Sequence, residues 1–108
     1  MAQMIVIYRT PKNPAAFDRH YFEVHVPLAR QLPGLRQLET SRGPVISLYG
    51  ASEVHSVVSL HFDSLSDINA AFMSEYGRAC AADRAQLAPQ WHDVQMYLFD
   101  SSRMPRRF

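Results

Sequence analysis

The chain has 108 residues, a usual length for a single domain with one hydrophobic core. Hydrophobic residues make up 47% and charged residues 19%, a globular composition that excludes a disordered chain. The net charge of +1 argues against nucleic-acid binding, because nucleic-acid-binding proteins present a strongly basic surface.

The single cysteine, Cys80, cannot form an internal disulfide and favours a reducing compartment, which predicts a cytoplasmic location. The apolar stretch near the N-terminus has no basic segment before it and ends at Arg9, so we expect neither a signal peptide nor a membrane span. The last residues hold three arginines around one proline, which predicts a mobile terminal segment. Its role does not follow from the sequence; the residues are Arg103, Pro105, Arg106 and Arg107.

The N-terminal third predicts a strand followed by a helix. Residues 4–8 are apolar and rich in β-branched side chains, which predicts a buried strand. Asn13 and Pro14 suit the cap and first turn of a helix, and Pro33-Gly34 ends it. Its expected buried stripe follows helical spacing: Phe17, Tyr21, Val24, Leu28 and Leu32.

Two strands are predicted in the middle of the chain. Residues 35–42 suggest a half-exposed strand. The pattern of residues 43–54 fits either an edge strand or an ordered loop. Residues 55–62 alternate in character. We therefore expect Val58, Leu60 and Phe62 to lie under the helices and the opposite face to hold His55, Val57, Ser59 and His61.

The C-terminal third predicts helix and then strand. Ser64 suits a helix cap with Asp67 three residues later, and we expect Gly77 to interrupt the helix before a second piece at 78–87. Residues 94–99 predict the last strand, and Trp91 is expected to fill the core.

The resulting order β-α-β-β-α-β predicts an α+β, ferredoxin-like domain spanning residues 1–108, with an antiparallel sheet and both helices on one face. The other sheet face lacks a cover of its own. We therefore expect a homodimer through this face.

The first helix carries a motif that extends beyond what helix formation requires. It reads Phe17, His20-Tyr21, then EVHVPLA at 23–29 and LPGL at 32–35. This pattern resembles the EthD-like family, and the resemblance continues at 38–43, 62–65 and 81–83. It implies a dimeric α/β barrel formed by two ferredoxin-like sheets. Similar proteins include the EthD component of ether-degradation gene clusters, methylmuconolactone isomerase, polyketide cyclases and cofactor-free monooxygenases, so the fold alone does not determine the chemistry.

His25, within the motif, is the first candidate for chemistry. Imidazole titrates near neutral pH, so His25 would be a general acid or base, with Tyr21 one turn earlier to orient it. The alternative is a packing histidine that bonds a backbone carbonyl left free by Pro27. His61 and His55 would line the space between two sheets, or be polar residues at the dimer interface or sheet rim.

Three further residues are candidate ligand contacts. Asp83 matches a family position and could hold a catalytic histidine or a substrate hydroxyl, although a helix cap or surface ion pair is the commoner role. Tyr8 and Tyr97 offer phenol groups to a ligand, although strand tyrosines are usually core residues with a solvated hydroxyl.

No metal or cofactor is expected. His20 and His25 are five residues apart, about 140° around an α-helix, which is outside the spacing of paired metal ligands. The sequence has no glycine-rich phosphate loop, no CxxC and no GxSxG motif.

Two hypotheses for function follow. The first is a cofactor-independent acid/base enzyme, such as an isomerase, cyclase or monooxygenase-like protein, acting on a small apolar oxygenated compound through His25, Tyr21 and His61. The second is a non-catalytic accessory protein that binds such a hydrophobic ligand in a catabolic or secondary-metabolite pathway.

Overall fold

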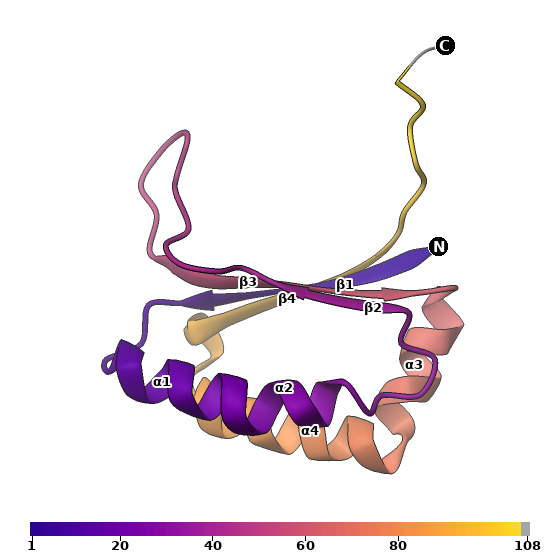
Figure 1. Cartoon of the computed structure of the whole chain (residues 1–108), viewed down its shortest axis with the longest axis horizontal. Helices are drawn as coiled ribbons and strands as arrows, with labels where there is room; N and C mark the ends of the chain where they lie inside the picture. Colours follow the sequence, from indigo (N-terminus) through magenta and orange to yellow (C-terminus); the bar gives the residue numbers. More distant parts are fainter. Residues whose placement is uncertain (107–108) are drawn as a thin grey trace.

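The computed structural model describes residues 1–106 and contains a four-stranded antiparallel sheet covered by helices on one face (Figure 1). The strands lie in the order β2-β3-β1-β4. Their bounds are Ala2–Arg9 for β1, Gln37–Thr40 for β2, Val54–Phe62 for β3 and Val94–Asp100 for β4. The α+β, ferredoxin-like prediction is therefore confirmed. None of the helices in residues 1–106 is long and apolar enough to cross a membrane.

The first helical segment has three consecutive parts: α1 (Pro14–His20), a π-helical turn η1 (Tyr21–His25) and α2 (Val26–Ala29). Asn13 caps it, since its side chain accepts a hydrogen bond from the Ala16 amide at 3.1 Å. The predicted start of this helix is confirmed.

The π-helical turn changes which side chains face the sheet. The Val26 amide donates to the Tyr21 carbonyl, five residues back, so this turn contains one extra residue. Pro27 cannot donate to the carbonyl four residues before it and would crowd that carbonyl in a regular helix, which favours the wider turn. Val24, predicted on the buried stripe, is consequently 41% exposed, and Val26 is buried instead.

The second helical region consists of α3 (Leu65–Met73) and α4 (Glu75–Leu87), followed by a 3-10 turn, η2 (Trp91–Asp93). Ser64 caps α3 as predicted, accepting from the Asp67 amide at 3.1 Å. The interruption was wrongly assigned to Gly77: the helix breaks at Ser74, which is extended and caps α4. Gly77 is buried, and a Cβ there would collide with the Ala71 carbonyl and the Phe72 backbone, so glycine permits the close approach of α3 and α4.

The core lies between the sheet and the helices. Alternate residues of β1 and β3 are buried on this side, which confirms the predicted orientation of Val58, Leu60 and Phe62. Tyr8, Phe62 and Ile68 are the largest fully buried side chains. Trp91 is not part of the core, contrary to the prediction: it lies on η2 and is 88% exposed.

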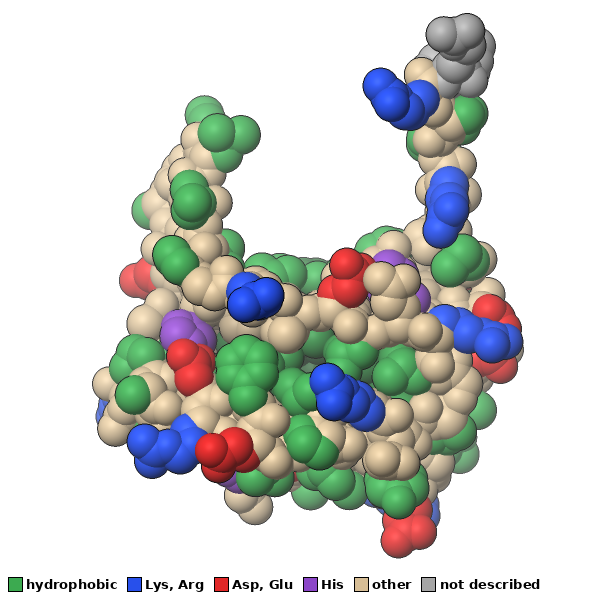
Figure 2. Space-filling model, in the orientation of Figure 1, with side chains coloured by type: hydrophobic (Ala, Val, Ile, Leu, Met, Phe, Trp, Pro, Cys, Tyr) green, Lys and Arg blue, Asp and Glu red, His purple; other side chains and the backbone are tan. Residues whose placement is uncertain are grey.

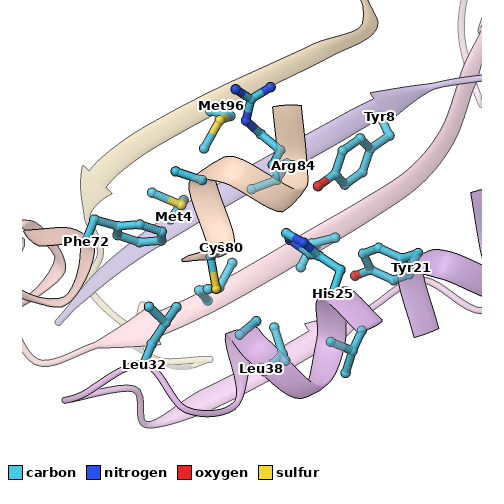
Figure 3. A pocket seen from close by; sticks show the side chains of 16 residues that line it. Met4, Tyr8, Tyr21, His25, Leu32, Leu38, Phe72, Cys80, Arg84 and Met96 are labelled. Carbon is cyan, nitrogen blue, oxygen red and sulfur yellow. The ribbon is translucent and has the colours of Figure 1, made fainter. Parts of the chain in front are cut away.

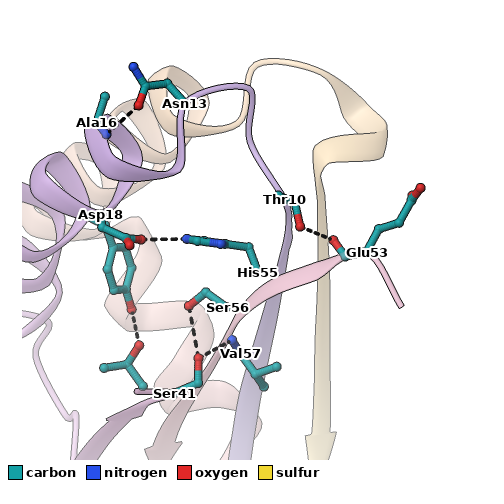
Figure 4. A network of polar contacts seen from close by, with 11 residues as sticks. Thr10, Asn13, Ala16, Asp18, Ser41, Glu53, His55, Ser56 and Val57 are labelled. Atoms are coloured by element: carbon teal, nitrogen blue, oxygen red, sulfur yellow. Dashed lines mark hydrogen bonds and ion pairs between the residues drawn. The ribbon is translucent and has the colours of Figure 1, made fainter. Parts of the chain in front are cut away.

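His55 departs from the alternation of β3. The pairing register of β1 and β3 shifts between Tyr8 and Arg9, where Arg9 pairs with Val54 and His55 is left over. The irregularity turns the His55 ring towards α1, where Nε2 lies 2.7 Å from Asp18 Oδ1 (Figure 4). The prediction that His55 lies on the face away from the helices was therefore wrong.

The sheet face opposite the helices, which we call the open face, carries Ile5, Ile7, Val57, Tyr97 and Phe99. The segment 43–53 forms neither helix nor strand and rises on this side, as do residues 101–106 (Figure 1). The two segments stand on either side of a hollow in the space-filling view (Figure 2). Arg107 of the predicted arginine-rich tail lies outside the described residues.

Candidate functional site

A partly open cavity of about 80 Å³ lies between the helices and the sheet, and we call it the helix–sheet cavity (Figure 3). Most of its wall is apolar and comes from β1, β3, α2 and α4. Four side chains with polar groups also line it: Tyr8, Tyr21, His25 and Arg84. An apolar cavity with a few convergent polar groups is typical of a small-molecule site.

His25 is held at the cavity wall by Asp83. Nδ1 of His25 lies 2.9 Å from Oδ2 of Asp83, and the two side chains are only 13% and 10% exposed. A carboxylate accepts hydrogen bonds, so this contact places the proton on Nδ1 and leaves Nε2 as the acceptor. Nε2 forms no hydrogen bond with another side chain or backbone group of residues 1–106. The arrangement leaves a neutral imidazole with one free basic nitrogen.

His20 binds the same carboxylate from the solvent side. Its Nε2 lies 2.7 Å from Oδ1 of Asp83, and its side chain is 36% exposed. The expectation that His20 and His25 point in different directions was wrong, because η1 widens the helix by one residue and brings residues five apart to one side. Asp83 is buried between them and is not the cap or surface ion-pair residue that commonly occupies such a position.

Burial dominates the electrostatics of the cavity. It lowers the pKa of His25 below its ordinary value of 6.5, although the hydrogen bond and charge of Asp83 act in the opposite direction. Burial also raises the pKa of Tyr8, Tyr21 and Cys80, the last to about 11. At neutral pH these groups are therefore an uncharged imidazole, two phenols and a thiol.

The two tyrosines of the cavity differ in what their hydroxyls do. Tyr21 stacks on His25, with 5.8 Å between ring centroids, and its hydroxyl donates to Thr40 Oγ1 at 3.0 Å. Tyr21 therefore orients the imidazole ring and uses its hydroxyl for the fold. The Tyr8 hydroxyl forms no hydrogen bond within residues 1–106, and Figure 3 shows it turned towards the side of the cavity that holds His25 and Arg84.

Two candidate residues lie elsewhere. The His61 side chain lies on the open face of β3, where its Nε2 is 3.1 Å from Oε1 of Glu39. Tyr97 lies on the open face of β4 and is 50% exposed. The sheet separates both from His25 and Tyr21. Asp83 contacts the histidines and is not part of the cavity wall.

Sequence reasoning missed two residues of the site, His20 and Arg84. The signal for His20 was its spacing of five from His25 in a segment with an internal proline, which favours a π-helical turn. For Arg84, no local sequence feature indicated a place in the site, apart from its position directly after Asp83. Within residues 1–106, no group of three or more His, Cys, Asp or Glu side chains could hold a metal ion.

A model of the EthD domain matches residues 9–90 of the chain. A protein of Rhodococcus erythropolis, described as an uncharacterised 11.0 kDa protein in the thcB-thcC intergenic region, is 36% identical over 89 residues, 82% of this chain and 84% of the relative. The structure of an ethyl tert-butyl ether D (EthD) family protein from Bacillus halodurans superimposes with a TM-score of 0.85 at 28% identity, covering 94% of this chain and 99% of that one.

Two more distant structures share the fold. SnoaB of Streptomyces nogalater, a cofactor-independent oxygenase, has a TM-score of 0.67 at 11% identity, with 98% of this chain and 97% of that chain covered. A dimeric protein of unknown function from Bacteroides fragilis, with a ferredoxin-like fold, has a TM-score of 0.63 at 12% identity, with 93% and 95% covered. At these identities the likeness concerns the fold and not the chemistry.

Proposed function

The chain belongs to the EthD domain family, and from that premise we propose that it is a cofactor-independent acid/base enzyme acting on a compact, largely apolar oxygenated molecule in the helix–sheet cavity. The observation that carries the proposal is the buried pair of His25 and Asp83 at the wall of an apolar cavity. Perturbed titratable groups held by a specific partner inside a cavity are typical of active sites.

His25 is the proposed catalytic base. Its free Nε2 takes a proton from the substrate, and the imidazolium that forms is stabilised by the adjacent Asp83 carboxylate. The same nitrogen then returns the proton at another position of the molecule, so the net reaction is an isomerisation or ring closure with no net loss of protons. Because the pKa of His25 is lowered, the basic form predominates at neutral pH.

Tyr8 and Tyr21 have supporting roles in this proposal. The Tyr8 hydroxyl donates a hydrogen bond to an oxygen of the substrate, since burial keeps the phenol protonated. Tyr21 holds the plane of the His25 ring by stacking. His61 and Tyr97 have no part in the reaction, because they lie on the open-face side of the sheet.

The cavity volume limits the substrate. About 80 Å³ is well below the several hundred Å³ of sites for drug-sized ligands, so a molecule with a single small ring suits it better than a polycyclic one. The alternative function is that of an accessory protein that only holds a hydrophobic molecule. Apolar walls suffice for holding, whereas a buried imidazole oriented by a carboxylate costs desolvation energy, which favours catalysis.

We also propose that two copies of the chain pair through their open faces. Tyr97 and Phe99 are 50% and 40% exposed on this face, beside Ile5 and Ile7. Leu48 and Tyr49 of the segment 43–53 are 100% and 98% exposed on the same side. A second copy would bury these apolar side chains, and two-fold pairing is the commonest form of homo-oligomer.

The proposed reaction is tested by solvent-proton exchange. Compact lactones and quinones are incubated with the protein in deuterium oxide, and deuterium incorporation is followed by NMR. We expect His25→Gln to reduce incorporation about 100-fold or more, the usual contribution of a general base. His92→Gln is the matched control, because His92 lies on η2 and is exposed. If a compound binds in the cavity and the unmodified chain exchanges it no faster than buffer alone does, the chain is a binding protein. Equally accelerated exchange with His25→Gln would show that His25 is not the base.

A further inference from the structure

Arg84 places a positive charge at a largely apolar cavity. It lies on α4, one residue after Asp83, is half-buried and contributes to the wall of the helix–sheet cavity. Figure 3 shows its guanidinium group on the side of the cavity near Met96, away from Leu32 and Leu38. Charged side chains are rarely placed against apolar walls without a partner, because removing them from water is costly.

The guanidinium group has no anionic partner in the described part of the chain. Its Nη1 donates to the Ala88 carbonyl at 3.3 Å, which uses one of the five N–H donors. No Asp or Glu carboxylate of residues 1–106 forms an ion pair with it. The neighbouring Asp83 carboxylate is occupied by His20 and His25.

Arg84 acts electrostatically on the other polar groups of the cavity. Burial raises the pKa of Tyr8, and the charge of Arg84 partly opposes this rise. Burial lowers the pKa of His25, and Arg84 lowers it further, while Asp83 raises it and His20 lowers it. Arg84, Tyr8 and His25 therefore influence one another electrostatically, and all three line the same cavity.

We infer that the helix–sheet cavity binds a compact organic acid whose carboxylate pairs with Arg84 while its apolar part contacts the cavity wall. The planar guanidinium group matches a carboxylate geometrically and accepts it with two parallel hydrogen bonds. The Tyr8 hydroxyl supplies one further donor. This inference rests on the proposed function, since it names the substrate class of the same cavity.

A purely structural role for Arg84 makes a different prediction. Arginine near the C-terminus of a helix can bond a terminal carbonyl, as Arg84 does with Ala88, and in that position it stabilises the negative end of the helix. In that case the cavity would bind charged and neutral molecules of one shape equally well.

The test compares benzoate with benzamide, which have the same ring and similar size but differ in charge. Binding to the full chain is measured by NMR titration of 15N-labelled protein, with the resonances of cavity residues as the readout. We expect benzoate to bind at least about tenfold more tightly than benzamide to the unmodified chain, because charge-assisted hydrogen bonds are about twice as strong as neutral ones.

Three variants complete the experiment. Arg84→Gln should remove the preference for benzoate and leave benzamide affinity within about twofold, whereas Arg84→Lys should keep part of it. Arg78→Gln is the matched control, since Arg78 is exposed on the same helix and is not part of the cavity wall.

The inference is overturned if the unmodified chain binds benzamide as tightly as benzoate, or if Arg84→Gln keeps the preference. In both cases the cavity remains a binding site and the proposed acid/base reaction is unaffected. If neither compound perturbs cavity resonances, the inference is overturned as well, whereas the proposed reaction is decided separately by the deuterium-exchange experiment.

Discussion

Oδ2 of Asp83 lies 2.9 Å from Nδ1 of His25, although 58 residues separate them in the sequence. The contact joins α4 to η1 within the helix layer and determines which nitrogen of His25 is available to the cavity. Its consequences for tautomer, stability and proton transfer can be measured on the purified protein.

Replacing Asp83 with Asn should change the tautomer of His25. An amide group offers one oxygen acceptor where the carboxylate has two, so it cannot accept from His20 and His25 as Asp83 does. We expect part of the His25 population to move its proton to Nε2, visible in the 15N chemical shifts of the ring. Stability should fall by about 1–3 kcal/mol, because buried polar groups lose their partners.

Asp18→Asn is the control for this substitution. Asp18 also accepts from a histidine, His55, at 2.7 Å, but its side chain is 49% exposed and water can replace the lost bond. The loss of stability should therefore be smaller than with Asp83→Asn. Equal losses from the two substitutions, with the His25 tautomer unchanged, would show that Asp83 does not orient His25.

The pH dependence of stability provides a second prediction. Burial lowers the pKa of His25 in the folded chain below the ordinary value of 6.5, so in that interval the unfolded chain binds more protons. The contribution of neutral His25 is complete above pH 6.5 and is lost as the pH falls through the lower, folded pKa. The free energy of unfolding should therefore decrease as the pH falls below 6.5, by less in His25→Gln than in the unmodified chain.

Urea unfolding at several pH values measures this difference. The other groups near His25, which are Asp83, His20 and Arg84, are present in both proteins, so the comparison isolates the imidazole. Parallel stability curves for the two proteins would show that the His25 pKa does not change on folding.

The fold could be predicted from local patterns because these patterns reflect local physics. The alternation in 58–62 determines the buried face of β3, and the pair Asn13-Pro14 begins α1 whatever the rest of the chain does. The register shift that turns His55 has no such local cause. It depends on how β3 pairs with β1 at the Tyr8–Arg9 step, which alternation within one strand cannot indicate.

Only part of the candidate site could be predicted from the sequence, for a similar reason. The motif pointed to His25 and Tyr21, and a separate match pointed to Asp83, but only tertiary packing brings Asp83 to His25. His20 was set aside because regular helix geometry was assumed, whereas Pro27 accompanies a π-helical turn. Residue type alone also misled at Trp91, since this large apolar residue proved to be exposed.

Cys80 should react slowly with thiol reagents. It belongs to the cavity wall, and burial raises the pKa of its thiol to about 11, so at pH 7 only about one thiol in ten thousand is ionised. We expect reaction with dithionitrobenzoate at least about 100-fold slower than that of free cysteine, with full reactivity in urea. A ligand in the cavity should slow it further. A rate in the folded protein that matches the rate in urea would contradict the burial of Cys80.

The open face should hold two copies of the chain together. Tyr97→Ser combined with Phe99→Ser removes two aromatic side chains from this face, and sedimentation equilibrium should then show a dimer weakened at least about tenfold or a monomer. Met73→Ser is the control, because Met73 is 68% exposed but ends α3 on the helix side. We expect it to leave association unchanged. A monomer of 12.3 kDa for the unmodified chain at micromolar concentration would contradict the pairing, and a dimer unaffected by the double substitution would place the interface elsewhere.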